Sequence, residues 1–144
     1  MIGLFPPSEK AVEKLYYENE SELTAVCNFL LENQYPDSRI ELFDSVNTIE
    51  FYTDNNAGGR NKDKSEITEK NITDSLETIV DSGFIRVLKE YNYISFQVWG
   101  SYGESVNLVF SPDSEPNISE INAKEKVVEK IKPANWFYYR EKFE

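Results

Sequence analysis

The sequence predicts an α+β domain in which an N-terminal helix or helical hairpin packs on one face of an antiparallel, mainly meander β-sheet with a short inserted helix. Three observations predict this fold class. Apolar residues recur at helical spacing near the N-terminus, they alternate with polar residues in several later stretches, and turn residues separate those stretches. A chain of 144 residues with 40% hydrophobic residues can bury one core, so we expect a single domain over residues 1–144.

A long helical stripe follows Pro6-Pro7. Ser8 can cap the first free N–H groups of a helix, and Glu9 suits its positive end. The stripe runs to about residue 33, and Asn19-Glu20-Ser21 is a potential break at which Ser21 could cap a second helix. The pattern therefore allows either one bent helix or two. The inward residues lie within about 120° of the helical wheel and are Val12, Leu15, Tyr16, Asn19, Leu23, Val26, Cys27 and Leu30.

The apolar period changes from 3.6 to 2 after Pro36. Ile40 and Leu42, and then Ile49 and Phe51, alternate with polar residues. This alternation predicts two antiparallel strands around a turn at residues 44–47.

The middle of the chain predicts a loop and then a helix. Residues 54–65 hold almost no apolar side chain and include two glycines, so we expect a mobile loop there. A short helix should open at Thr73-Asp74, with Leu76, Ile79 and Val80 turned inward. Gly83 is placed to end that helix in the left-handed conformation.

Residues 84–89, 93–99 and 105–110 carry the clearest β pattern and predict a three-stranded meander. Nearer the C-terminus, Val127, Val128 and Ile131 fit either a strand or a short helix, and residues 136–139 form an aromatic segment. Four side chains fall on the face of the meander opposite its apolar residues: Tyr93, Gln97, Trp99 and Asn107.

Large aromatic side chains on an outward face need a cover. The C-terminal segment 136–143 or a second subunit, which would make a homodimer, could provide it. Alternatively, this face recognises a partner through Tyr93 and Trp99, because Tyr and Trp are frequent anchors of interfaces. A sugar-binding face is a further alternative.

The residue types that are missing narrow the chemistry. The chain has no histidine and only one cysteine, Cys27, which excludes Ser-His-Asp and Cys-His catalysis, His-ligated metals and an internal disulfide. We therefore expect no catalytic residue and no cofactor. Glu41, Asp44, Glu50 and Asp54 would lie close together on the first hairpin, so a carboxylate-dependent metal-binding enzyme is an alternative.

The formal net charge is −11, with −8 on residues 1–58 and −3 on residues 59–144. Such a chain repels nucleic acid and anionic lipid and attracts a basic protein. No apolar run approaches the roughly 20 residues of a membrane span, and the N-terminus lacks the apolar region of a secretory signal. We expect a cytoplasmic protein that binds neither membrane nor nucleic acid.

The segments GFIRVLKEYNYISFQVWGS, VNLVFSPDSEPN and NWFYYREKF resemble a group of small acidic bacterial single-domain proteins, some with immunity roles in polymorphic-toxin or contact-dependent inhibition systems. The resemblance covers about 55 residues, from residue 84 to residue 139. It implies a cytoplasmic protein that binds a cognate toxin domain and blocks it, with no activity of its own.

We expect a non-enzymatic binding protein, an immunity-type inhibitor that occludes a basic toxin domain. A bacterial adaptor or structural domain with another partner is the alternative. Acidic side chains of the first helical region and first hairpin would steer the partner, and aromatic side chains would anchor it. The candidate partner-binding residues are Glu18, Glu20, Glu22, Glu41, Glu50, Tyr93 and Trp99.

Overall fold

The computed structural model describes residues 5–90, 93–101, 103–112, 125–131 and 135–142. Within these residues the helices are α1 (Glu9–Glu18), α2 (Glu20–Glu32) and α3 (Lys70–Asp81). The strands are β1 (Ser38–Glu41), β2 (Thr48–Asp54), β3 (Arg60–Glu66), β4 (Arg86–Glu90), β5 (Tyr93–Ser101), β6 (Glu104–Phe110), β7 (Glu125–Lys130) and β8 (Trp136–Lys142).

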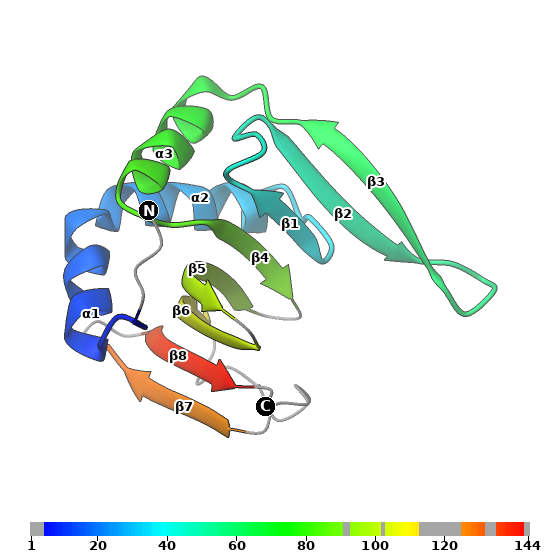
Figure 1. Cartoon of the computed structure of the whole chain (residues 1–144). Helices are drawn as coiled ribbons and strands as arrows, with labels where there is room; N and C mark the ends of the chain where they lie inside the picture. The colour runs from blue at the N-terminus through cyan, green and yellow to red at the C-terminus, as the bar shows by residue number, and fades with distance from the viewer. Residues whose placement is uncertain (1–4, 91–92, 102, 113–124, 132–134, 143–144) are drawn as a thin grey trace.

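The described strands form one antiparallel sheet in the order β3-β2-β1-β4-β5-β6-β8-β7. The helices lie together on one side of this twisted sheet, and the β2–β3 hairpin extends beyond the other strands (Figure 1). The α+β class is therefore confirmed, as is the meander of β4, β5 and β6. Of the residues that fitted either a strand or a helix, Val127 and Val128 lie in a strand, β7, and Ile131 follows it. Strand β8 inserts between β6 and β7.

The N-terminal stripe forms two helices that separate at Asn19, whose φ of −124° and ψ of 20° leave the helical region. Ser8 caps α1 as predicted, since its Oγ accepts a hydrogen bond from the Ala11 N–H. Ser21 does not cap α2, because its hydroxyl donates to Glu22 instead. The side-chain amide of Asn19 donates to the carbonyl of Leu15 at 2.9 Å, which satisfies an acceptor exposed by the break.

The main core lies between the helices and the sheet. Trp136 of β8 is at its centre, with ring centroids 5.0 Å from Tyr16, 6.0 Å from Phe96 and 5.1 Å from Phe110. Burying each such side chain stabilises the fold by about 1.5–3 kcal/mol. Cys27 belongs to the same core, and burial raises the pKa of its thiol, so it acts as a small apolar residue.

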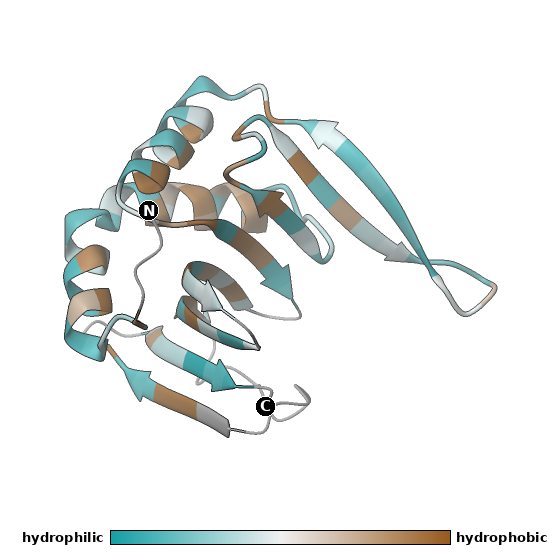
Figure 2. Ribbon diagram, viewed as in Figure 1, coloured by the Kyte–Doolittle hydropathy of each residue, from teal (hydrophilic) through white to brown (hydrophobic). Residues whose placement is uncertain are grey.

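The loop predicted for residues 54–65 is wrong at Asp54, which is the last residue of β2, and from Arg60 onward, where the chain forms β3 along the whole length of β2. Every residue of β3 is exposed, and Figure 2 shows the strand as hydrophilic beside the alternating β2. Its backbone hydrogen bonds to β2, rather than a buried face, hold it in place. A loop remains at residues 55–59, where Asn55 Oδ1 accepts from the Gly59 N–H.

Helix α3 begins three residues before the predicted Thr73, and Ile72 joins Leu76 and Ile79 as its buried residues, while Val80 is half-buried. Gly83 has a φ of +108°, so it ends the helix in the predicted left-handed conformation. In the described part of the chain, no helix combines the length and the apolar character needed to cross a membrane.

Candidate functional site

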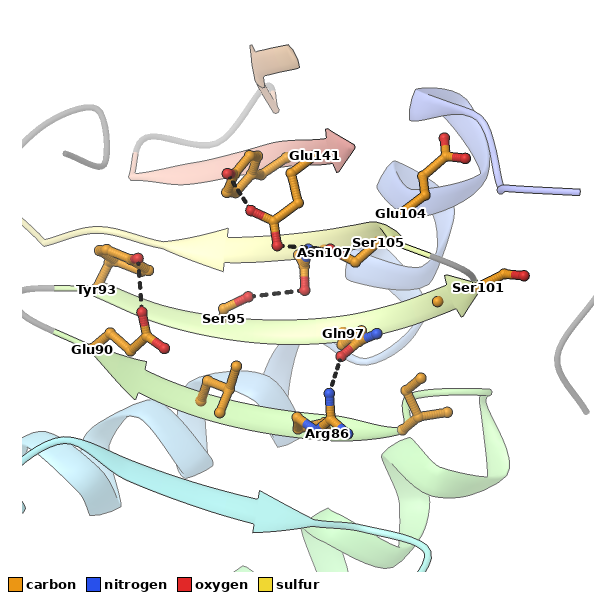
Figure 3. A pocket seen from close by; sticks show the side chains of 15 residues that line it. Arg86, Glu90, Tyr93, Ser95, Gln97, Ser101, Glu104, Ser105, Asn107 and Glu141 are labelled. Atoms are coloured by element: carbon orange, nitrogen blue, oxygen red, sulfur yellow. Dashed lines mark hydrogen bonds between the residues drawn. The ribbon is translucent and has the colours of Figure 1, made fainter. Parts of the chain in front are cut away.

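The face of the sheet opposite the helices contains a groove of about 610 Å³, to which β4, β5, β6 and β8 contribute. Strand pairing places its polar side chains together. Gln97 lies opposite both Arg86 on β4 and Asn107 on β6, and Asn107 lies opposite Tyr139 on β8. Figure 3 shows Arg86, Gln97 and Asn107 along the groove. We refer to this site below as the groove.

The floor of the groove is polar although it is buried. Ser95, Gln97 and Asn107 are only 7%, 9% and 5% exposed. The Ser95 hydroxyl donates to Asn107 Oδ1 at 3.1 Å, and Asn107 Nδ2 donates to Ser105 Oγ at 3.1 Å. Gln97 Nε2 donates to the carbonyl of Trp99 at 3.2 Å. The described residues offer no acceptor for the second N–H of either amide, so each keeps a donor for a ligand.

Arg86 fixes the Gln97 amide from the β4 side. Its Nη1 donates to Gln97 Oε1 at 2.8 Å, while its Nε donates to Glu41 Oε1 at 2.7 Å. Arg39 also lies 3.1 Å from that oxygen of Glu41. Because Glu41 balances its charge, Arg86 acts here as a rigid donor rather than as a free cation.

Each margin of the groove, β8 on one side and β4 on the other, carries a carboxylate next to a tyrosine. Glu141 accepts hydrogen bonds from Ser105 and Tyr139, and Glu90 accepts one from Tyr93 at 3.2 Å. Burial raises the pKa of the Tyr139 hydroxyl, and so do its hydrogen bond to Glu141 and the negative charges of Glu141 and Glu90. The groove therefore has a negative potential around Glu90 and Glu141, which basic groups would neutralise.

No described lysine or arginine side chain pairs with Glu90 or Glu141. In the backbone register, Lys126 of β7 lies opposite Glu141.

Tyr93 and Trp99, which we predicted to share the outward face, lie on opposite faces. Tyr93 lines the groove, but it is only 3% exposed, because it packs with Val109, Phe137 and Tyr139 in a second apolar cluster. The prediction for Trp99 is wrong, because a β-bulge between Gln97 and Trp99 adds one residue to β5. The extra residue turns Trp99 toward the helices, where it is 5% exposed in the main core. It is therefore not an accessible anchor.

Glu41 and Glu50 lie on the groove side of the sheet, at a smaller pocket of about 220 Å³. Both have cationic neighbours, since Glu41 pairs with Arg39 and Arg86, and Glu50 lies 3.5 Å from Lys62 and 3.7 Å from Lys64. These cations reduce the attraction that either carboxylate would exert on a basic partner.

Glu18, Glu20 and Glu22 come together elsewhere, at the α1–α2 junction, around Tyr17, which is 47% exposed. We call these four residues the helix-junction patch. Their only described cationic partner is Lys14, 3.7 Å from Glu18 on the same helix. The predicted partner-binding residues thus divide among the groove, the smaller pocket, the helix-junction patch and the core.

The metal alternative receives no geometric support from the described residues. Glu41, Asp44 and Glu50 line the smaller pocket together with Arg39 and Lys64, whereas Asp54 lies near Arg60 at 3.7 Å. In the described part of the chain, no group of three or more such side chains is arranged to hold a metal ion.

Arg86, Ser95, Tyr139 and Glu141 were not among the residues predicted to bind a partner. On β5, the polar residues Ser95 and Gln97 flank the apolar Phe96. This alternation could have indicated that Ser95 shares the polar face of Gln97. Tyr139 and Glu141 gave no such signal, because only the pairing of β6 with β8 brings them to Asn107 and Ser105. Comparisons with protein-family models, curated proteins and solved structures find no match to this chain.

Proposed function

We propose that this protein is a non-enzymatic binding protein of the immunity type, which receives part of a basic toxin domain in the groove and thereby occludes it. The observation that carries this proposal is the buried polar floor of the groove. Ser95, Gln97 and Asn107 are held in fixed positions, yet both amides keep a donor for a ligand. A concave site with a few convergent polar groups is typical of a binding surface.

Charge favours a basic partner. The net charge of −11 would speed the encounter with a cationic protein, and Glu90 and Glu141 provide acceptors for its basic side chains. The helix-junction patch adds carboxylates on the helical side of the molecule. In this proposal the protein acts in the cytoplasm, where it neutralises the toxin domain by covering its surface.

Capture of the partner from lysate of the native cells tests the proposal. The bait is the tagged wild type, compared with a Glu90→Gln, Glu141→Gln variant and with a Glu66→Gln, Glu77→Gln control that removes the same charge on β3 and α3, away from the groove and the helix-junction patch. We expect the wild type and the control to capture a basic protein that the groove variant loses. Adding the wild type in equal amount should then abolish the activity of that captured protein.

Two outcomes would contradict this function. Equal capture by the groove variant would remove the groove from the interface. Capture that leaves the activity of the partner unchanged would indicate an adaptor instead of an inhibitor.

A further inference from the structure

We propose that the groove recognises an extended stretch of polypeptide backbone that carries a basic side chain, and that the Gln97 and Asn107 amides read its peptide groups. This inference rests on the proposed function and specifies which element of the partner binds. Gln97 and Asn107 occupy directly paired positions on β5 and β6, so the two amides stand side by side on the groove floor (Figure 3).

Each of the two amides uses part of its hydrogen-bonding capacity within the groove and keeps the rest for a ligand. Gln97 Oε1 accepts from Arg86 and its Nε2 donates to Trp99, while Asn107 Oδ1 accepts from Ser95 and its Nδ2 donates to Ser105. A primary amide can donate two hydrogen bonds and accept two. The described residues therefore leave one N–H and one oxygen lone pair on each amide, and these match the C=O and N–H groups of a peptide backbone.

The amides are held in place before any ligand binds. Asn107 lies between two serine hydroxyls, and Gln97 is held by Arg86, which Glu41 holds in turn. A Cβ at Gly100 would overlap Nε2 of Gln97, so the glycine leaves the space that this amide occupies. Groups that are already ordered lose little entropy on binding.

The dimensions favour a short extended segment. The groove crosses β4, β5, β6 and β8. Three strand spacings of about 4.8 Å give a length of about 14 Å, which roughly four extended residues span.

The charge of the groove favours a basic side chain on the bound segment. Glu90 on β4 and Glu141 on β8 each accept a hydrogen bond from a buried tyrosine and have no described cationic partner, so both carboxylates attract lysine or arginine. A neutral sugar could also use the amides and hydroxyls, but it would leave these charges unmatched.

Blocked synthetic tetrapeptides test this inference. The probe is acetyl-Ala-Arg-Ala-Arg-amide, and the comparison peptides carry Glu in place of Arg or N-methyl groups on the backbone. Maltotriose is the sugar probe. Nuclear magnetic resonance follows the side-chain NH₂ signals of Gln97 and Asn107 in the full chain. We expect the arginine peptide to shift both signals and N-methylation to weaken its binding about three- to tenfold per lost hydrogen bond.

A matched pair of glycine variants tests the amide directly. Gly100→Ala displaces the Gln97 amide and should weaken the arginine peptide about three- to tenfold, as for one lost hydrogen bond. Gly59→Ala, in the β2–β3 turn, makes the same change away from the groove and should leave binding unchanged. N-methylated and unmodified peptides of equal affinity would overturn backbone recognition. Shifts caused by maltotriose and not by the arginine peptide would assign the groove to a saccharide.

The same variants separate this inference from the proposed function. If the partner is lost by the Glu90→Gln, Glu141→Gln variant but binds Gly100→Ala with unchanged affinity, the groove binds a partner without reading its backbone. If the peptide binds while no variant changes partner capture, the groove recognises peptides and the proposed inhibitor function fails.

Discussion

The surroundings of Glu50 change the pKa of its carboxyl, so this residue makes the stability of the fold depend on pH. Burial alone would raise the pKa of its carboxyl, but the charge and hydrogen bond of Lys62, with help from Tyr52 and Lys64, lower it overall. A carboxyl whose pKa is lower in the folded chain stabilises the fold above its unfolded pKa. That stabilisation is lost as the pH falls through the folded value.

We expect Glu50→Gln to lower the free energy of unfolding at neutral pH and to match the wild type in acid, below the folded pKa of Glu50. Urea unfolding at a series of pH values measures the difference. In a Lys62→Met, Lys64→Met background, the pH-dependent part should shrink, because only the Tyr52 hydrogen bond would then lower the pKa of Glu50 against the effect of burial. A difference that persists unchanged into acid would show that Glu50 acts through packing rather than charge.

Arg86 uses two nitrogens of one planar group to hold Glu41 and Gln97, at 2.7 and 2.8 Å. Lysine carries a single ammonium and cannot reproduce this fork, so Arg86→Lys should destabilise the fold by about 1 kcal/mol. Thermal unfolding gives the stability. Arg39→Lys, which changes an arginine with a single described contact to Glu41, should cost less. Equal losses in the two variants would mean that the Gln97 contact contributes nothing.

Asn19 connects the helices of the α-layer. Its Nδ2 donates to Leu15 at the end of α1, and its Oδ1 accepts from Ser82 Oγ just after α3 at 3.0 Å. Asn19→Ala would remove both side-chain hydrogen bonds and leave the half-buried Ser82 hydroxyl without this acceptor, so the free energy of unfolding should fall by about 1–3 kcal/mol. Chemical denaturation measures this loss, and Asn28→Ala, on the exposed face of α2, should change it by less than about 0.5 kcal/mol.

A double-mutant cycle checks the mechanism. If Asn19 acts through Ser82, the loss caused by Asn19→Ala should be smaller when Ser82 is already alanine. Fully additive losses would show that the two side chains do not cooperate.

The elements that the sequence predicted correctly are those with one buried face. The stripe of α1 and α2 and the alternation of β4, β5 and β6 belong to this class. Strand β3 was missed because it buries no side chain and depends on the backbone of β2. The predicted face of Trp99 was wrong because strict alternation does not reveal the extra residue of a β-bulge. The β8 side of the groove could not be predicted because it depends on pairing between segments that are distant in the sequence.

At the scale of the whole molecule, acidic groups divide into paired and unpaired sets. Glu41 and Glu50 have cations within 4 Å, whereas the helix-junction patch has little compensation. Long-range attraction should therefore depend more on this patch than on the first hairpin.

Reversing the patch charges with Glu18→Lys, Glu20→Lys and Glu22→Lys should slow association with the captured basic partner about tenfold at low salt and little at high salt. Stopped-flow kinetics across salt concentrations measure this rate. Glu66→Lys, Glu77→Lys and Asp81→Lys make the same change in net charge on β3 and α3. Equal slowing by both sets would show that net charge alone matters, and unchanged kinetics in both would exclude steering.

The bulge in β5 has a consequence for single-codon deletions. Gln97 pairs with Asn107, and Trp99 pairs with the next residue of β6, Val106, so Val98 is supernumerary in the ladder. Removing Val98 should restore regular alternation in β5 and keep the indole of Trp99 in the main core, although the core loses the packing of one valine side chain. Removing Ser95 should instead exchange the faces of the neighbouring strand residues and prevent folding. Circular dichroism and tryptophan emission compare the folding of the two deletion variants. Equal loss of folded structure in both would contradict the prediction that the fold tolerates deletion of Val98.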